Sequence, residues 1–97
     1  LIRSDNSIVY DIMRWEMDVL DKLEKMRSNP QDVRFSDALR IAEHYFGKPR
    51  IRGSHHFFST PWQGDPLVNL QRVGGKAKAY QIRQLLAAID RLGKESR

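Results

Sequence analysis

The strongest constraint on the fold is a change of pattern along the chain. From Ser7 to about Arg27, apolar residues recur in steps of three and four, and this spacing returns from about Ala79 to Leu92, before Gly93. The periodicity predicts an amphipathic helix toward each end of the chain. Much of the segment between them is broken by glycine and proline, which is typical of short strands and turns. The apolar stripe of the first helix is Ile8, Ile12, Trp15, Val19, Leu23 and Met26, and that of the last is Ile82, Leu85, Leu86, Ile89 and Leu92.

A further helix is expected from about Ser36 to Phe46. Ser36 suits the N-cap position, Asp37 suits the first turn, and Gly47 suits the position after the last turn. We expect its core-facing side chains to be Leu39, Ala42 and Phe46, together with Tyr45.

Three short strands are expected after this helix, at Pro49–Arg52, His55–Thr60 and Leu67–Leu70. Gly53-Ser54 forms the turn between the first two, residues 61–66 form a loop, and Gly74-Gly75 breaks the chain again. Short connections favour antiparallel pairing, with the helices packed on one face of the sheet. The predicted class is therefore α+β. The layout is α-β-β-β-α, like that of double-stranded-RNA-binding domains, with an additional N-terminal amphipathic helix.

Length and composition limit the possibilities further. A chain of 97 residues has room for one modest core, and 40% hydrophobic residues with 30% charged residues are typical of a globular protein. We see no apolar run that approaches a membrane span, so no membrane partner is expected. Cysteine is absent, which excludes disulfides and is compatible with a reducing cytoplasm, where we expect the protein to act.

The net charge of +5 is distributed unevenly along the chain. Residues 1–47 carry seven basic and nine acidic side chains, a net charge of −2, whereas residues 48–97 carry ten basic and three acidic ones, a net charge of +7. A surplus of this kind is either a solvated surface or the contact region for a polyanion. The basic half also contains two of the three histidines.

These two histidines, His55 and His56, are adjacent in a predicted strand, so their side chains should point to opposite faces of the sheet. One should face the helices and the other the open face, and alternation alone does not say which. The same geometry argues against both binding one metal ion. The third histidine, His44, lies on the preceding helix without further ligands at metal-binding spacing, so we expect no metal or cofactor.

Two interpretations of the histidine pair remain open. The residue pattern by itself favours structural roles, with one imidazole partly buried and hydrogen-bonded and the other exposed. The alternative is acid/base chemistry on RNA, because a neutral imidazole can take the proton of a ribose 2′-hydroxyl near neutral pH. Nearby lysine or arginine side chains would then stabilise the negative charge that develops on the phosphate.

Lys76 and Lys78 are candidates for this second role, because the sequence places them at the start of the last helix. Positive side chains there oppose the helix dipole, which suggests either a phosphate-binding role or two solvated lysines. Tyr80, close by, could stack a base or seal the helix against the sheet, and we favour the core position.

Three segments together resemble the HicA toxins of bacterial toxin–antitoxin modules, which are small mRNA interferases. They are "RFSDALRIAEHYFG", "GSHHFF" and "DPLVNLQRVGGKAKAYQIRQLL", and the likeness covers roughly Leu20 to Leu92 in order and spacing. The chain differs from the family at Ala79, where relatives often have proline, and in Leu1 to about Glu16, which lie outside the family pattern.

The resemblance implies a double-stranded-RNA-binding-like domain over residues 31–97, preceded by an N-terminal helix within residues 1–30. It implies metal-independent cleavage of mRNA and inhibition by a HicB-type antitoxin, in a hetero-oligomer. The first histidine after Gly-Ser is catalytic in this family, which assigns that role to His55 and leaves His56 as a supporting or core residue. The expected RNA contacts are Arg50, Arg52, Gly53, Ser54, Lys76 and Lys78.

The N-terminal helix suggests a further partner contact or a homodimer, because its first apolar residues need burial. Two other functions stay open. One is a non-catalytic RNA-binding module of similar fold, and the other is a protein-binding domain whose basic half meets an acidic partner. Salt-dependent binding of RNA without cleavage would distinguish the first from a nuclease.

Overall fold

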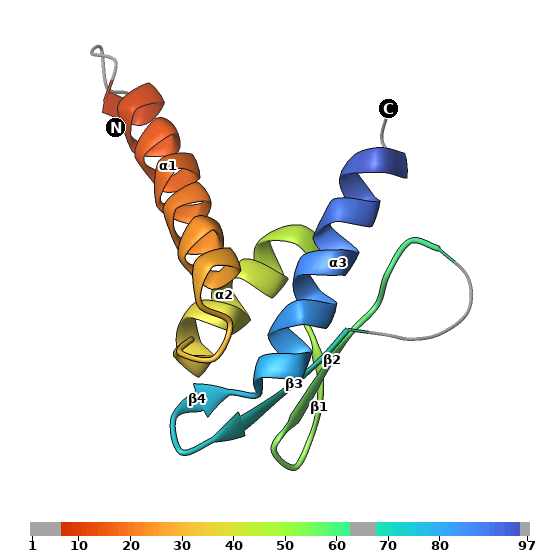
Figure 1. The fold of residues 1–97 in the computed structure, drawn as a ribbon. Coiled ribbons are helices and arrows are strands. Elements are labelled where there is room, and N and C mark those ends of the chain that lie inside the picture. The colour runs from red at the N-terminus through yellow and green to blue at the C-terminus, as the bar shows by residue number, and fades with distance from the viewer. Residues whose placement is uncertain (1–6, 63–67, 96–97) are drawn as a thin grey trace.

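The computed structural model describes residues 7–62 and 68–95, which form three helices and one antiparallel sheet (Figure 1). The chain is therefore an α+β protein, as the sequence predicts. In chain order the elements are α1 (Ser7–Ser28), α2 (Phe35–Phe46), β1 (Arg50–Arg52), β2 (His55–Phe58), β3 (Val68–Val73), β4 (Lys76–Ala77) and α3 (Ala79–Glu95).

The four strands lie side by side in the order β1-β2-β3-β4, and each neighbouring pair is antiparallel. The turn between β1 and β2 is a two-residue hairpin loop in which Gly53 has φ 59°. Gly53 has a positive φ and Ser54 does not, which defines a type II′ turn, and glycine adopts its first position without steric cost. The sequence therefore predicted this turn correctly, and it fixes Arg52 opposite His55.

The sequence predicted three strands, and the fourth is a correction. β3 continues to Val73, and Gly74 and Gly75, with φ 58° and 79°, turn the chain back into β4. Two consecutive positive φ values form a type I′ hairpin rather than a break between sheet and helix. Lys76 consequently lies in a strand and not at the start of the last helix. The predicted start of the third strand at Leu67 and most of the preceding loop lie outside the described residues.

The outer edge of β4 is covered by the short segment that leads into α2. The backbone N–H of Phe35 donates to Gly75 O at 2.9 Å, and the N–H of Ala77 donates to Val33 O at 3.0 Å. Arg34 and Lys76 form an antiparallel bridge between these hydrogen bonds. Residues 33–35 therefore form one more extended segment along this edge of the sheet, at the point where α2 begins.

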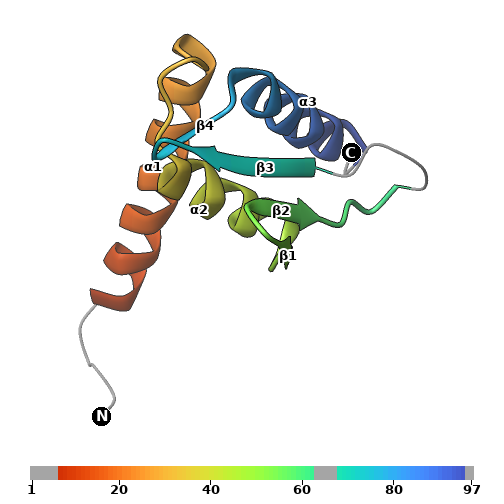
Figure 2. The same ribbon diagram turned by 90° about the horizontal axis from the view of Figure 1, so that it is seen from below.

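The core lies between one face of the sheet and the helices α2 and α3 (Figures 1 and 2). The largest fully buried apolar side chains are Phe35, Phe58, Met26, Ile41, Leu70, Ile82 and Leu85. They come from all three helices and from β2 and β3. The predicted stripe of the last helix is buried at Ile82, Leu85, Leu86 and Ile89, and Leu92 is half-buried.

Helix α2 begins one residue earlier than predicted, and Arg34 rather than Ser36 occupies its N-cap position, without a side-chain cap. The buried face consists of Phe35, Ala38, Ile41 and Ala42. The predicted core residues Leu39, Tyr45 and Phe46 are only half-buried at the border of this face. The hydrogen bond from the Phe35 N–H to Gly75 O fixes where α2 begins relative to the sheet. No local sequence pattern contains this contact. Helix α3 also passes through Gly93 to Glu95.

Helix α1 is only half covered by the rest of the molecule. Val19, Leu23 and Met26, in its C-terminal part, are buried in the core, whereas Ile8 and Ile12 at the other end remain 56% and 55% exposed. The N-terminal part extends beyond α2 and away from the sheet (Figures 1 and 2). Among the described helices, none combines the length and the apolar character that a membrane span requires.

Candidate nucleic-acid interface

The sheet has one face covered by helices and one open face, and the two histidines of β2 lie on different faces. His56 shares its face with the buried Phe58, and its ring packs edge-on against Phe35 of α2 with centroids 4.9 Å apart. His55 therefore lies on the open face. The alternation predicted for the pair is confirmed, and the structure settles which histidine faces the helices.

The strand register arranges the open face in two rows of side chains. In one row Arg52 of β1 lies opposite His55, which lies opposite Gln71 of β3. In the second row Arg50 lies opposite Phe57, which lies opposite Asn69. Side chains directly opposite each other on one sheet face have Cβ atoms about 4.5–5.5 Å apart. Two arginines, an imidazole, an aromatic ring and two amides therefore share one small surface.

Within this surface His55 contacts two neighbours. Its Nδ1 lies 3.3 Å from Oδ1 of Asn69, and its ring stacks on Phe57 with centroids 5.8 Å apart and planes 12° apart. An amide oxygen can only accept a hydrogen bond, so this contact is a hydrogen bond in the tautomer of His55 that carries its proton on Nδ1. A neutral imidazole protonated on Nδ1 keeps an unshared electron pair on Nε2. That nitrogen is then able to accept a proton from another molecule.

The Gly53-Ser54 turn is tied to the same surface. The Nε2 of Gln71 donates to the Ser54 hydroxyl at 3.3 Å, which joins the turn to β3 across the intervening strand. Both turn residues are exposed at the end of the hairpin. The two turn residues singled out from the sequence therefore lie beside the row that contains His55.

Lys76 lies farther along the open face, opposite Val73 of β3. Strand spacing and rise place its Cα roughly 12 Å from that of His55. Its Nζ forms an ion pair with Asp32 Oδ1 at 2.7 Å, and this hydrogen bond, together with the lysine charge, holds the pKa of the Asp32 carboxyl below its usual range. The charge of Lys76 is therefore partly neutralised by Asp32.

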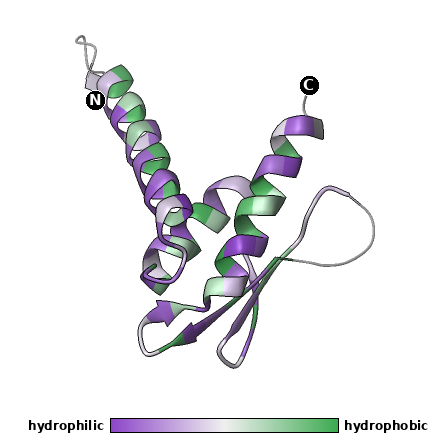
Figure 3. Ribbon diagram, viewed as in Figure 1, coloured by the Kyte–Doolittle hydropathy of each residue, from purple (hydrophilic) through white to green (hydrophobic). Residues whose placement is uncertain are grey.

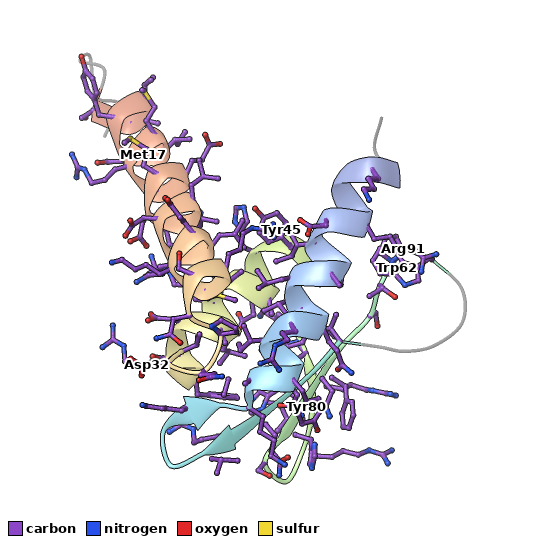
Figure 4. The ribbon with its side chains drawn as sticks, viewed as in Figure 1. Met17, Asp32, Tyr45, Trp62, Tyr80 and Arg91 are labelled. Atoms are coloured by element: carbon purple, nitrogen blue, oxygen red, sulfur yellow. The ribbon has the colours of Figure 1, made fainter. Side chains whose placement is uncertain are left out.

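Lys78 and Tyr80 are the remaining two predicted positions near the start of α3. Lys78 is half-buried, and its carbonyl oxygen accepts the N–H groups of Gln81 and Ile82 at 3.0 and 3.1 Å. No contact among the described residues joins Lys78 to His55. Tyr80 is 52% exposed, so the core position favoured from the sequence is wrong (Figure 4).

Three members of the open face were missed in the sequence, namely Phe57, Asn69 and Gln71. Alternation in "VNLQ" gives a signal, because the buried Val68 and Leu70 leave the two amides on the other face. Their pairing with β2 depends on register, however, and a long connection between two strands does not fix register. The sequence could therefore identify the face of these residues but not their neighbours.

The third histidine lies apart from this surface. His44 is exposed on α2, where its ring packs edge-on against Tyr45 with centroids 4.9 Å apart. In the described parts of the chain, no three His, Cys, Asp or Glu side chains gather as metal ligands do.

Comparison with protein-family models, curated proteins and solved structures finds no match to this chain.

Proposed function

We propose that the chain is an mRNA-cleaving toxin of the HicA type, a metal-independent endoribonuclease in which His55 is the general base. The observation that carries this proposal is the hydrogen bond between His55 Nδ1 and Asn69, which leaves Nε2 free to accept a proton, directly opposite the cation Arg52. The resemblance in sequence is the second support, and it assigns the same residue.

In the proposed reaction, Nε2 of His55 removes the proton of a ribose 2′-hydroxyl. The oxygen O2′ forms a bond to the adjacent phosphorus while the bond from phosphorus to the 5′-oxygen breaks. The leaving oxygen takes a proton from water, and the imidazolium returns its own proton to the solvent. The products are a 2′,3′-cyclic phosphate and a 5′-hydroxyl end, and DNA, which lacks the 2′-hydroxyl, is not cleaved.

The arginines would stabilise the extra negative charge on the phosphate during this step. Arg52 lies opposite His55 and Arg50 lies one row away, both on an exposed strand. Guanidinium groups bind phosphate oxygens in a bidentate manner and keep their charge at all working pH values. Lys76, Lys78 and the Gly53-Ser54 turn are proposed to contact the RNA on either side of the cleaved bond.

Several coarser features agree with this proposal. The order α2, β1, β2, β3, α3 with both helices on one face is the arrangement expected for a double-stranded-RNA-binding-like domain, and β4 and α1 are additions to it. In this proposal the protein acts on mRNA in the cytoplasm, and a HicB-type antitoxin inhibits it by covering the open face of the sheet.

The decisive experiment is cleavage of a labelled mRNA by the purified chain in EDTA, beside the variants His55→Ala and His56→Leu. His56 is the matched control because it is the adjacent residue on the covered face, where its Nδ1 is buried and makes no hydrogen bond with any described residue. Replacing it with leucine should be neutral or slightly stabilising.

We expect the parent and His56→Leu to give cyclic-phosphate ends and His55→Ala to give none, with the far-UV circular dichroism of all three unchanged. Cleavage by folded His55→Ala at the parental rate would refute the assignment. Loss of cleavage on adding EDTA would refute the metal-independent mechanism.

A non-catalytic RNA-binding module is the second candidate, because Phe57 flanked by arginines and amides is a surface on which a base can stack. It predicts salt-dependent RNA binding by the parent and by His55→Ala alike, without cleavage by either. The same experiment, with a gel shift added, therefore separates the two functions.

A further inference from the structure

The N-terminal part of α1 exposes an unusual amount of apolar surface. The side chains concerned, each between 42% and 67% exposed, are Ile8, Val9, Tyr10, Ile12, Met13, Trp15, Met17 and Leu20. Hydrophobic residues continue along α1 up to its N-terminal end, beyond the region that α2 covers (Figure 3). Trp15 faces α2, where Arg40 lies 4.2 Å over its ring and the His44 ring lies 6.4 Å away.

The size of this surface separates it from ordinary exposed residues. Five of these side chains, Val9, Tyr10, Met13, Met17 and Leu20, share one side of the helix and are 52–67% exposed. At roughly 200 Å² each when fully exposed, they present about 600 Å² of surface. The largest apolar patch on a typical monomer is roughly 300–600 Å². A stable protein–protein interface buries about 800 Å² on each partner, and this side of the helix supplies most of that area.

The spacing of these residues indicates the kind of partner. Tyr10, Met13, Met17 and Leu20 follow one another in steps of three, four and three, which is the seam that packs against another helix in a left-handed pair. A shallow hollow in the surface is lined by Tyr10, Met13 and Met17 together with the charged residues Arg14, Asp18 and Asp21. The partner that fits this seam is itself an amphipathic helix.

The charge on α1 argues for a second copy rather than a polyanion. Helix α1 carries four basic and five acidic side chains, a net charge of −1, in contrast to the basic second half of the chain. Many of its charges are already paired along the helix, as in Asp11 with Arg14 and Asp21 with Lys25. A net charge of −1 on each helix gives only weak repulsion between two copies, whereas RNA or an anionic membrane is not attracted to this surface.

We propose that the N-terminal part of α1 is a homodimerisation helix, which pairs through the Tyr10, Met13, Met17 and Leu20 seam with the same segment of a second copy. A two-fold pair is the simplest arrangement, because each copy then uses the same surface. The helix projects away from the sheet, so the open face that contains His55 stays accessible in the dimer (Figure 2). This pairing does not depend on the proposed nuclease function.

The test is sedimentation equilibrium, which measures the molar mass of the protein in solution. The full chain is compared with the double variants Met13→Glu/Met17→Glu and Tyr10→Glu/Leu20→Glu. These four side chains are 52–67% exposed, so the substitutions should leave the domain folded, which circular dichroism checks. The matched control is Ile51→Glu, which removes an equally exposed side chain, 62%, from β1.

We expect the parent and Ile51→Glu to be dimers at about 10–100 μM, above the micromolar dissociation constant that is the weak end for an interface of this size. Both double variants should be monomers, with dissociation constants raised at least 100-fold. A monomeric parent at these concentrations would overturn the proposal. So would a dimer that survives in both double variants, or one that is lost in Ile51→Glu.

Discussion

Gln81 and Gln71 form a side-chain to backbone hydrogen bond between α3 and the sheet: the Oε1 of Gln81 accepts the backbone N–H of Gln71 at 2.7 Å. Among the described residues, Gln81 is the one polar side chain that is fully buried. The bond satisfies a backbone donor of β3 beyond the end of β4, and Gln71 lies opposite His55 on β2. It therefore links the packing of α3 to the position of the candidate site.

The first prediction concerns this bond. Gln81→Met keeps the side-chain volume but leaves the Gln71 N–H unpaired, which should lower the free energy of unfolding by about 1–3 kcal/mol. Gln84→Met, at an exposed position of the same helix, should change it by less than about 0.5 kcal/mol. Urea denaturation measures both, and equal stability of the two variants would contradict the role given to Gln81.

A second prediction uses the adjacent residues Phe57 and Phe58, which lie on opposite faces of β2. Phe58 is fully buried, so Phe58→Ala should cost about 3–5 kcal/mol of stability. Phe57→Ala should instead weaken RNA binding by about 1–3 kcal/mol, the contribution of one stacked base. Thermal melts and RNA titrations of both variants test this division. Unchanged RNA affinity in Phe57→Ala would remove Phe57 from the interface.

The third prediction concerns the ion pair between Arg27 and Asp90, which should make the stability of the protein depend on pH. The Arg27 guanidinium donates to both carboxylate oxygens of Asp90, at 3.2 and 2.5 Å, and this hydrogen bonding holds the pKa of Asp90 below its usual range. Because the folded-state pKa is depressed, the pair stabilises the protein above the unfolded pKa of about 3.9 and loses that effect as the pH falls below it.

The expected size is small, because the two side chains are 43% and 49% exposed. Asp90→Asn should therefore lower the free energy of unfolding by at most about 1 kcal/mol near neutral pH and by nothing at about pH 2. Asp21→Asn, which removes a more exposed pair within α1, is the control and should cost less. A cost of Asp90→Asn that persists at the acidic pH would rule out this ion pair as its cause.

A fourth prediction concerns Asp32, which pairs with Lys76 on the open face. Asp32→Asn frees the lysine, so RNA should bind more tightly, and the slope of log affinity against log salt should steepen by about 0.7 if one more phosphate is contacted. Lys76→Ala removes a lysine that is already paired with Asp32, so it should change the slope by much less than this. The double variant should behave like Lys76→Ala, and any other result would mean that Asp32 acts through a different group.

Local sequence patterns predicted some parts of the fold and not others. The stripes of α1 and α3 span several turns, and the Gly53-Ser54 hairpin has a strong turn signal, so these elements were predicted correctly. β4 has only two residues, which is too short for alternation to be visible. Its pairing with Val33–Phe35 joins residues about forty positions apart in sequence, and no local pattern contains such a contact.

The candidate site likewise depends on contacts between residues that are far apart in the sequence, which local patterns do not contain. Alternation placed His55 and His56 on opposite faces, but the side that each one occupies depends on where α2 packs. The neighbours Asn69 and Gln71 depend on the register between β2 and β3. The sequence placed Lys76 at the start of the last helix, whereas it lies in β4, and its ion pair with Asp32 requires the turn before α2 to lie against this strand.

The two edges of the sheet are protected in different ways from pairing with other molecules. The β4 edge is already occupied by the Val33–Phe35 segment, and the β1 edge is only three residues long and carries Arg50 and Arg52. Short, positively charged edge strands resist pairing with the edges of other molecules. The open face can therefore stay uncovered without making the sheet a template for fibril growth, even when the protein is concentrated.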